Sequence, residues 1–128
     1  TVSCYFVDQK NQLWVGKRTG LIKVSSDFKS YETINFFENK IIRSLSSTNE
    51  NKLLVGTNKG LFTLENEHRI KEVLSNVTIV DLAKDKLKPI IYIATNKGLL
   101  QINDDSKVET IYPDIRFNKV LLDNRNHV

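Results

Sequence analysis

A twelve-residue phrase that this chain repeats limits its folds more than any other feature of the sequence. Its copies are LWVGKRTGLIKV at 13–24, LLVGTNKGLFTL at 53–64 and IYIATNKGLLQI at 91–102, about 40 residues apart. A fourth unit begins near residue 117. Self-similarity at a period of this length is typical of repeat proteins, in which each unit buries its apolar surface against its neighbours.

Each copy of the phrase predicts a β-hairpin. Two β-prone runs flank a polar turn that ends in glycine, as 13–16 and 21–24 do around 17–20. A short glycine-containing connection between two such runs favours a tight hairpin, because glycine adopts the positive φ angle that other residues avoid. The glycines in this position are Gly20, Gly60 and Gly98.

The first strand of each hairpin is apolar on both faces. In the first copy, Leu13 and Val15 lie on one face, and Trp14 and Gly16 lie on the other. A strand of this kind is buried on both sides. The small residues before the turns, Gly16, Gly56 and Ala94, predict that another backbone packs closely there.

Two weaker strands flank each hairpin, so each unit should contain four strands. The upstream strands are expected at 2–7, 41–45, 79–82 and 117–122, and the downstream strands at 28–34, 70–74 and 108–112. No helical pattern of useful length interrupts them. Stacked four-stranded units of about 40 residues are typical of β-propeller blades. We therefore expect an all-β chain, with residues 1–128 forming about three antiparallel blades of a larger propeller.

Composition excludes several classes of function. The net charge of +4 comes from scattered charges, which favour a solvated surface over a nucleic-acid interface. No apolar run is long enough to cross a membrane, so no membrane contact is expected within this segment. The single cysteine, the spacing of the two histidines and the lack of any catalytic motif predict no cofactor and no metal site.

The best-preserved copy resembles a known family repeat. Leu13-Trp14-Val15-Gly16 followed by Gly20-Leu21, with Asp8 ahead of it, is similar to the two-component regulator propeller repeat. The other copies depart from that pattern at Thr48 for the aspartate, Leu54 and Tyr92 for the tryptophan, and Ala94 for the glycine. The resemblance covers nearly the whole chain, because all copies are in register.

The resemblance implies a place in a bacterial sensor. Proteins with this repeat, frequent in Bacteroidetes, commonly carry a periplasmic pair of seven-bladed propellers on an inner-membrane protein with a cytoplasmic histidine kinase. This chain would then be part of the ligand-sensing domain of a homodimeric receptor that responds to glycan-derived oligosaccharides. The remaining blades of the same protein would be its direct neighbours. Because three blades cannot close a ring, we expect the isolated segment to associate or aggregate.

The hairpin turns are the first candidate ligand site. They should lie on one rim of successive blades and form an arc of cations and amides, suited to an anionic or hydroxyl-rich ligand. The candidate residues are Lys17, Arg18, Asn58, Lys59, Asn96 and Lys97. The alternative is that asparagine and lysine simply suit a tight turn.

The connections between blades are the second candidate site. A carbohydrate surface needs flat apolar rings beside polar groups. Phe36, Phe37, Tyr112 and Arg116 meet that requirement. The alternative for Phe36 and Phe37 is that their rings fill the core between two blades.

Two further function classes compete with the sensor. A propeller enzyme, such as a polysaccharide lyase or glycosidase, would place titratable groups on the inner strands, at positions such as Ser44, Asp81 and Lys119. These residues differ from unit to unit, so no shared catalytic arrangement is evident and the chain itself is not expected to be an enzyme. A protein-docking scaffold would need no small ligand at all.

Overall fold

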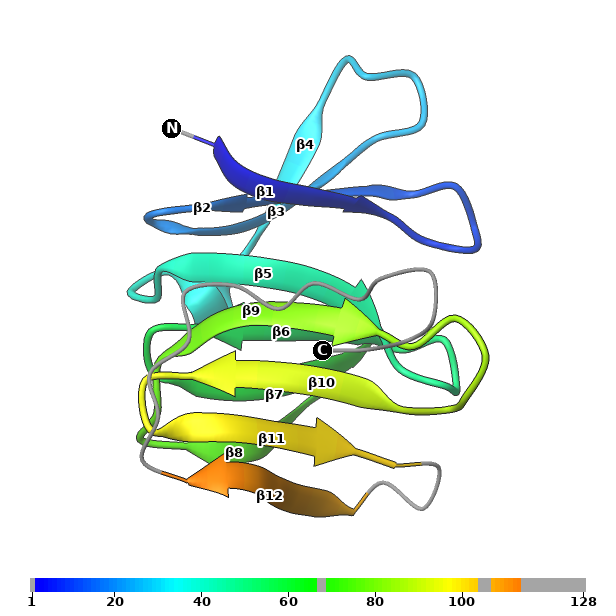
Figure 1. Ribbon diagram of the computed structural model, residues 1–128. Helices are drawn as coiled ribbons and strands as arrows, with labels where there is room; N and C mark the ends of the chain where they lie inside the picture. Colours follow the sequence, from blue (N-terminus) through cyan, green and yellow to red (C-terminus); the bar gives the residue numbers. More distant parts are fainter. Residues whose placement is uncertain (1, 67–68, 104–106, 114–128) are drawn as a thin grey trace.

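Three four-stranded antiparallel sheets make up the part of the chain that the computed structural model describes, which is residues 2–66, 69–103 and 107–113 (Figure 1). In each sheet, consecutive strands are hydrogen-bonded neighbours. A short 3-10 helix, η1 (Asn35–Phe37), joins the first sheet to the second. The expected all-β class and four-stranded blades are therefore confirmed.

The strands follow the repeat. The first sheet contains β1 (Val2–Val7), β2 (Leu13–Lys17), β3 (Gly20–Val24) and β4 (Tyr31–Ile34). The second contains β5 (Ile42–Ser47), β6 (Leu53–Thr57), β7 (Gly60–Asn66) and β8 (Arg69–Ser75). The third contains β9 (Ile79–Lys84), β10 (Ile91–Thr95), β11 (Gly98–Ile102) and β12 (Val108–Pro113). The repeated phrase thus forms the two central strands of every sheet.

The sheets stack through their first strands. β1 packs against β5, and β5 packs against β9, while β4, β8 and β12 form the far edges of their sheets. The first strands are therefore the inner strands of the stack and the fourth strands are the outer ones. Each inner strand has an irregularity in its pairing near its start, between Val2 and Cys4 in β1 and between Ile42 and Ser44 in β5.

Alternate apolar residues of the repeated phrase pack against the sheets on either side. In β6, every residue from Leu53 to Thr57 is buried, because sheets lie against both of its faces. In β2, Trp14 faces the second sheet and is buried, but Leu13 and Val15 are half-buried. No described sheet covers their face of the first sheet, where Tyr5 is 72 % exposed.

Two apolar clusters hold the stack together. The cluster between the first two sheets contains Trp14, Leu21, Ile34, Phe37, Ile42, Leu53, Val55, Phe62 and Leu64. The cluster between the last two contains Leu54, Leu61, Ile79, Leu82, Ile91, Ile93 and Ile102. Burial of these aliphatic and aromatic side chains is the main favourable term in the stability of the stack.

The glycines before the turns make room for the next sheet. A Cβ atom on Gly16 would lie 2.5 Å from Cγ2 of Ile42, and one on Gly56 would lie 2.5 Å from Cγ2 of Ile79. The close neighbour is therefore an isoleucine side chain of the following inner strand. The sequence-based expectation of a close backbone was wrong on this point, because the nearest atoms belong to side chains: these isoleucines and, at Gly16, Sγ of Cys4 in the same sheet at 2.6 Å.

Candidate functional site

The loops of the stack gather on two opposite rims (Figure 1). The hairpin rim contains the hairpin turns 17–20, 57–60 and 95–98 together with the connections 35–41 and 75–78. The opposite rim contains the turns 8–12, 48–52 and 85–90 between first and second strands, and the loop 25–30. Figure 1 shows the hairpin turns on the left and the turns that leave β1 and β9 on the right.

The asparagines of the hairpin rim hydrogen-bond to the backbone of the residues that directly precede the inner strands β5 and β9. Ile41 donates its N–H to Oδ1 of Asn58 at 2.9 Å, and Asn58 donates its own N–H to the Ile41 carbonyl at 3.2 Å. Thr78 and Asn96 repeat this pair at 2.9 and 3.1 Å. The Thr78 hydroxyl also donates to the Asn58 carbonyl at 3.2 Å, which links two blades. Turn chemistry therefore accounts for the carbonyl oxygens of both asparagine side chains.

Threonine hydroxyls fix two of the hairpin turns. Thr57 Oγ1 donates to the Gly60 carbonyl at 2.9 Å and accepts the Lys59 N–H at 3.0 Å. Thr95 makes the equivalent bonds at 2.8 and 3.0 Å. The glycines that end the turns have φ angles of +131°, +143° and +144°, which confirms the expected positive values. The lysine side chains between threonine and glycine are left in solvent.

Cations line the hairpin rim without described partners. Arg18, Lys59 and Lys97 are exposed and Lys17 is half-buried. None of these side chains forms an ion pair or hydrogen bond within the part of the chain that the structure describes. Arg43, also exposed, lies at the pairing irregularity of β5 on the same side. Sequence reasoning missed Arg43 because it lies outside the repeated phrase.

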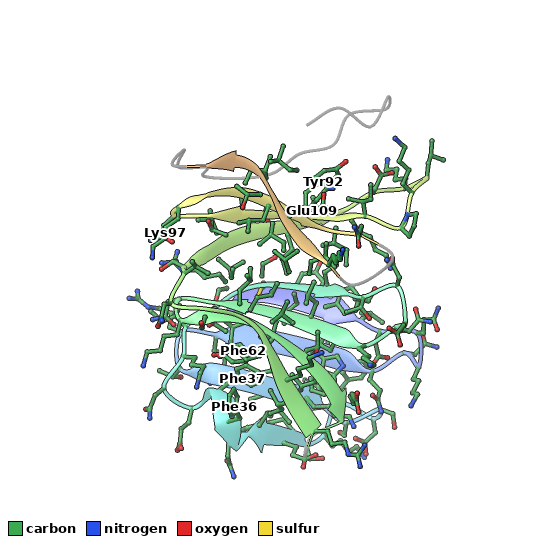
Figure 2. The ribbon with its side chains drawn as sticks, turned by 90° about the horizontal axis from the view of Figure 1, so that it is seen from below. Phe36, Phe37, Phe62, Tyr92, Lys97 and Glu109 are labelled. Atoms are coloured by element: carbon green, nitrogen blue, oxygen red, sulfur yellow. The ribbon has the colours of Figure 1, made fainter. Side chains whose placement is uncertain are left out.

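Two rings of the connection from the first to the second sheet form an aromatic cluster with one ring of β7 (Figure 2). The rings of Phe36, Phe37 and Phe62 meet edge to face, with centroids 5.1 to 5.7 Å apart. Phe37 is fully buried, which corrects its assignment as a ligand contact: its ring fills the core between two blades. Phe36 is 45 % exposed, but Lys40 Nζ lies 4.2 Å from its ring centroid and donates to its carbonyl at 3.0 Å.

Two candidate residues cannot be placed fully. The backbone of Tyr112 lies in β12 opposite Leu99, but its side chain is outside the described part. Arg116 lies outside the described residues, as do Lys119 and the start of the fourth unit.

The inner strands bring together two residues of the enzyme hypothesis. The Ser44 hydroxyl donates to Oδ1 of Asp81 at 3.5 Å, and that oxygen also accepts the Leu82 N–H at 2.9 Å. Cys4 pairs with Gly16 as Ser44 pairs with Gly56, and burial raises the pKa of its thiol to about 11. Among the described residues there is no cluster of three His, Cys, Asp or Glu side chains that could hold a metal ion.

On the opposite rim, one side-chain acceptor organises each turn. Asp8 accepts the N–H groups of Lys10 and Gln12, both at 2.9 Å, and the indole N–H of Trp14 at 3.0 Å. Thr48 Oγ1 accepts the N–H groups of Glu50 and Lys52 at 3.2 and 3.1 Å. Asp85 does the same for Leu87 and Lys88 at 2.8 and 3.1 Å. Threonine thus replaces aspartate in the second unit without loss of the turn.

A hollow of about 370 Å³ opens at the opposite rim between the first two sheets. Its walls include Trp14, Lys23 and Glu65. Lys23 Nζ lies 5.6 Å from the Trp14 ring centroid, and Glu65 pairs with Lys52 and Arg69 at 3.2 and 3.7 Å. Lys23 and Glu65 therefore each have a close partner, an aromatic ring for the lysine and two neighbouring cations for the carboxylate. Sequence reasoning did not find it, because its walls come from residues that the repeat does not preserve.

Comparisons with known proteins bear on the fold. No protein-family model and no curated protein matches the chain. Among solved structures, it resembles the extracellular domain of BT4673 from B. thetaiotaomicron, assigned to a hybrid two-component system, with 22 % identity, a TM-score of 0.78 and 98 % of this chain covered. No helix of the described residues is long and apolar enough to cross a membrane.

Two other solved structures are similar. The extracellular domain of BT3049 from B. thetaiotaomicron, also assigned to a hybrid two-component system, has 18 % identity and a TM-score of 0.67 over 91 % of this chain and 16 % of its own. An ancestral GH74 enzyme has 20 % identity and a TM-score of 0.66 over 78 % of this chain and 17 % of its own. The chain spans about a fifth of the BT4673 domain, 19 % of its length. These likenesses and the stacked sheets show the fold: the described residues are three blades of a β-propeller.

Proposed function

We propose that this chain is part of the extracytoplasmic ligand-sensing domain of a two-component signalling receptor. The observation that carries the proposal is the likeness to the BT4673 extracellular domain over 98 % of the chain with a TM-score of 0.78. The resemblance of the 13–24 phrase to the two-component regulator propeller repeat supports the same reading independently. In this proposal the domain lies on the periplasmic side of the inner membrane, in a Bacteroidetes protein.

The proposed ligand is a glycan-derived oligosaccharide, and the proposed contact surface is the hairpin rim. Its cations and the side-chain NH₂ groups of Asn58 and Asn96 can hydrogen-bond to sugar oxygens. Phe36, which is 45 % exposed, adds an aromatic ring from the connection 35–41 of the same rim. Binding would shift a homodimeric receptor between two arrangements only if the two arrangements differ in affinity for the ligand.

A propeller enzyme is the second candidate, because one of the solved structures that the chain resembles is a GH74 enzyme. The Ser44–Asp81 pair on the inner strands is the described chemistry closest to a catalytic site. Glycosidases usually need two carboxyl groups about 5 to 10 Å apart. Asp81 is the single carboxylate of β1, β5 and β9. The described inner strands therefore favour the sensor.

One experiment separates these functions. The intact protein is titrated calorimetrically with a panel of defined oligosaccharides, and each mixture is then analysed by mass spectrometry. Saturable binding without new products supports the sensor, and autophosphorylation that changes with the bound oligosaccharide would establish signalling. Turnover of an oligosaccharide by the propeller region would favour the enzyme. Binding of proteins but of no oligosaccharide would favour a docking scaffold.

A further inference from the structure

The two rims differ in the sign of their charge. In the turns and connections of the hairpin rim, residues 17–20, 35–41, 57–60, 75–78 and 95–98, the one carboxylate is Glu38. The same segments contain Lys17, Arg18, Lys40, Lys59 and Lys97. The turns of the opposite rim mix both signs, with Asp8 beside Lys10, Asp27 beside Lys29 and Glu50 beside Lys52. The basic excess of the described chain is thus concentrated on one side.

One lysine of the opposite rim has carboxylate partners, whereas the other lysines of its turns form no ion pair among the described residues. On the opposite rim, Lys52 lies 3.2 Å from Glu65, and this carboxylate with Glu50 raises the pKa of Lys52. Arg18, Lys59, Lys97 and Arg43 of the hairpin rim have no such carboxylate among the described residues. Like charges held on one surface create a positive potential that attracts anions. The hairpin rim therefore presents charge that the described blades do not neutralise.

The backbone positions of Lys59 and Lys97 are fixed by hydrogen bonds of the rim itself. The hydrogen bonds from Thr78 to Asn58 and between Thr78 and Asn96 tie the second and third hairpin turns to one connection. Lys59 and Lys97 follow these two asparagines directly, so their Cα atoms are held at neighbouring blades. Little backbone order must be gained when a ligand spans them, which favours binding.

We infer that the ligand of the hairpin rim is an anionic oligosaccharide, whose carboxylate or sulfate groups lie against Arg18, Lys59 and Lys97. This inference rests on the proposed function and narrows its ligand class. Arginine can pair with a carboxylate or sulfate through two parallel hydrogen bonds, and lysine acts as a point charge. The side-chain NH₂ groups of Asn58 and Asn96 belong to residues adjacent to Lys59 and Lys97 and can donate to the sugar hydroxyls between the anionic groups.

The test uses the intact protein and matched ligands. A uronic-acid oligosaccharide is compared with its carboxyl-reduced form of equal length, and a sulfated oligosaccharide with its desulfated form. We expect the anionic member of at least one pair to bind more tightly, and its affinity to fall as the salt concentration rises. The pair that shows the difference identifies the anionic group.

The variants remove the same charge from each rim. In the first, Arg18→Gln, Lys59→Gln and Lys97→Gln are combined. In the control, three exposed lysines of the opposite rim are replaced: Lys29→Gln, Lys86→Gln and Lys88→Gln. We expect the first variant to weaken binding of the anionic ligand about tenfold and the control to leave it within about twofold.

Each other outcome overturns a different statement. Equal affinity for the charged and neutral members of both pairs would refute the anionic class but leave the oligosaccharide sensor standing. Binding of no oligosaccharide at all would count against the proposed function itself. Equal losses in both variants would show a nonspecific charge effect. Tighter binding of single-stranded DNA, lost in the first variant, would show that the rim recognises a polyanion other than a glycan.

Discussion

The two rims of this stack keep their turns in shape by different means. The hairpin rim relies on glycine geometry and on threonine and asparagine side chains that bond to the backbone. The opposite rim relies on Asp8, Thr48 and Asp85, which accept backbone N–H groups, and on ion pairs around Glu65. Backbone geometry and neutral side chains therefore hold the hairpin rim, whose Arg18, Lys59 and Lys97 form no ion pair among the described residues, while carboxylates hold two of the three opposite-rim turns.

The largest effect is expected from Gly60→Ala on the hairpin rim. Gly60 has a φ angle of +143°, and a Cβ atom would run into the Leu74 carbonyl, which is backbone and cannot rotate away. The strain and the clash together should lower the free energy of unfolding by about 3 kcal/mol. Urea denaturation of the intact protein measures this, with the neighbouring Lys59→Ala as control. Equal stability of the two variants would show that the turn tolerates another geometry.

On the opposite rim, Asp8→Ala should cost about 2 kcal/mol of stability. The substitution removes the acceptor for two turn N–H groups and leaves the indole N–H of the buried Trp14 without its partner. Asp8→Asn is the matched control, because its amide oxygen can keep the turn bonds while its NH₂ group cannot accept the indole. We expect about half of the loss for the asparagine variant. An unchanged melting temperature for Asp8→Ala would contradict the importance of this acceptor.

Removal of one side-chain acceptor from the hairpin rim should have a smaller effect. Asn58→Ala deletes the acceptor for the half-buried Ile41 N–H, a loss of about 1 kcal/mol. Asn58→Asp keeps the acceptor and should restore most of the stability. If the asparagine is instead a major ligand contact, Asn58→Ala will weaken oligosaccharide binding far more than Lys59→Ala does, and titration of both variants would reveal it.

Cys4 lies in β1, between the two rims. We expect the free energy of unfolding to fall at alkaline pH because of its thiol. Its pKa is raised from 9.0 to about 11 by burial, so folding favours the neutral thiol. This contribution is fully present below pH 9 and is lost as the pH rises toward 11. Urea midpoints of the parent and of Cys4→Ala should therefore fall differently across that range. A constant difference between the two proteins would contradict the raised pKa.

The smallest effect is expected for Lys52→Gln on the opposite rim. Lys52 pairs with Glu65 at 3.2 Å, and this contact lowers the pKa of Glu65, but both groups are in solvent. Exposed pairs contribute little and are screened by salt. We expect no resolvable change in melting temperature at physiological salt. A clear loss that disappears in high salt would show that the ion pairs of this rim are worth more than their exposure suggests.

Most of the fold can be predicted from the sequence, because the same pattern of apolar and turn residues occurs in three copies. The alternation of Leu13, Trp14 and Val15 predicted a strand that serves two neighbours, and β6 is buried in that manner. The exposed Tyr5 marks where the alternation has no described partner. Periodicity does not say which atoms meet across blades, so the contact of Gly16 with Ile42 needed three-dimensional placement.

The candidate site was less predictable, since the same residue types suit turns and ligands. Asn58 and Asn96 were proposed for recognition, yet their carbonyl oxygens are engaged by the backbone. Phe36 and Phe37 are adjacent in sequence, but η1 turns one ring into the core and leaves the other partly exposed. The sequence does not predict a place for Arg43 on the hairpin rim, because that place depends on the irregular start of β5.

The hydrogen bond from the Trp14 indole to Asp8 couples two positions of the repeat that lie six residues apart. The second unit has Thr48 and Leu54 at these positions, and its turn is kept without an indole to satisfy. The third unit keeps the aspartate as Asp85 but has Tyr92 in place of the tryptophan. Losing the aspartate alone would strand a buried donor, so the route from one pair to the other should pass through the tryptophan first. An aspartate without the tryptophan, as in the third unit, is thus compatible with a folded turn, whereas a buried tryptophan without its acceptor is not expected.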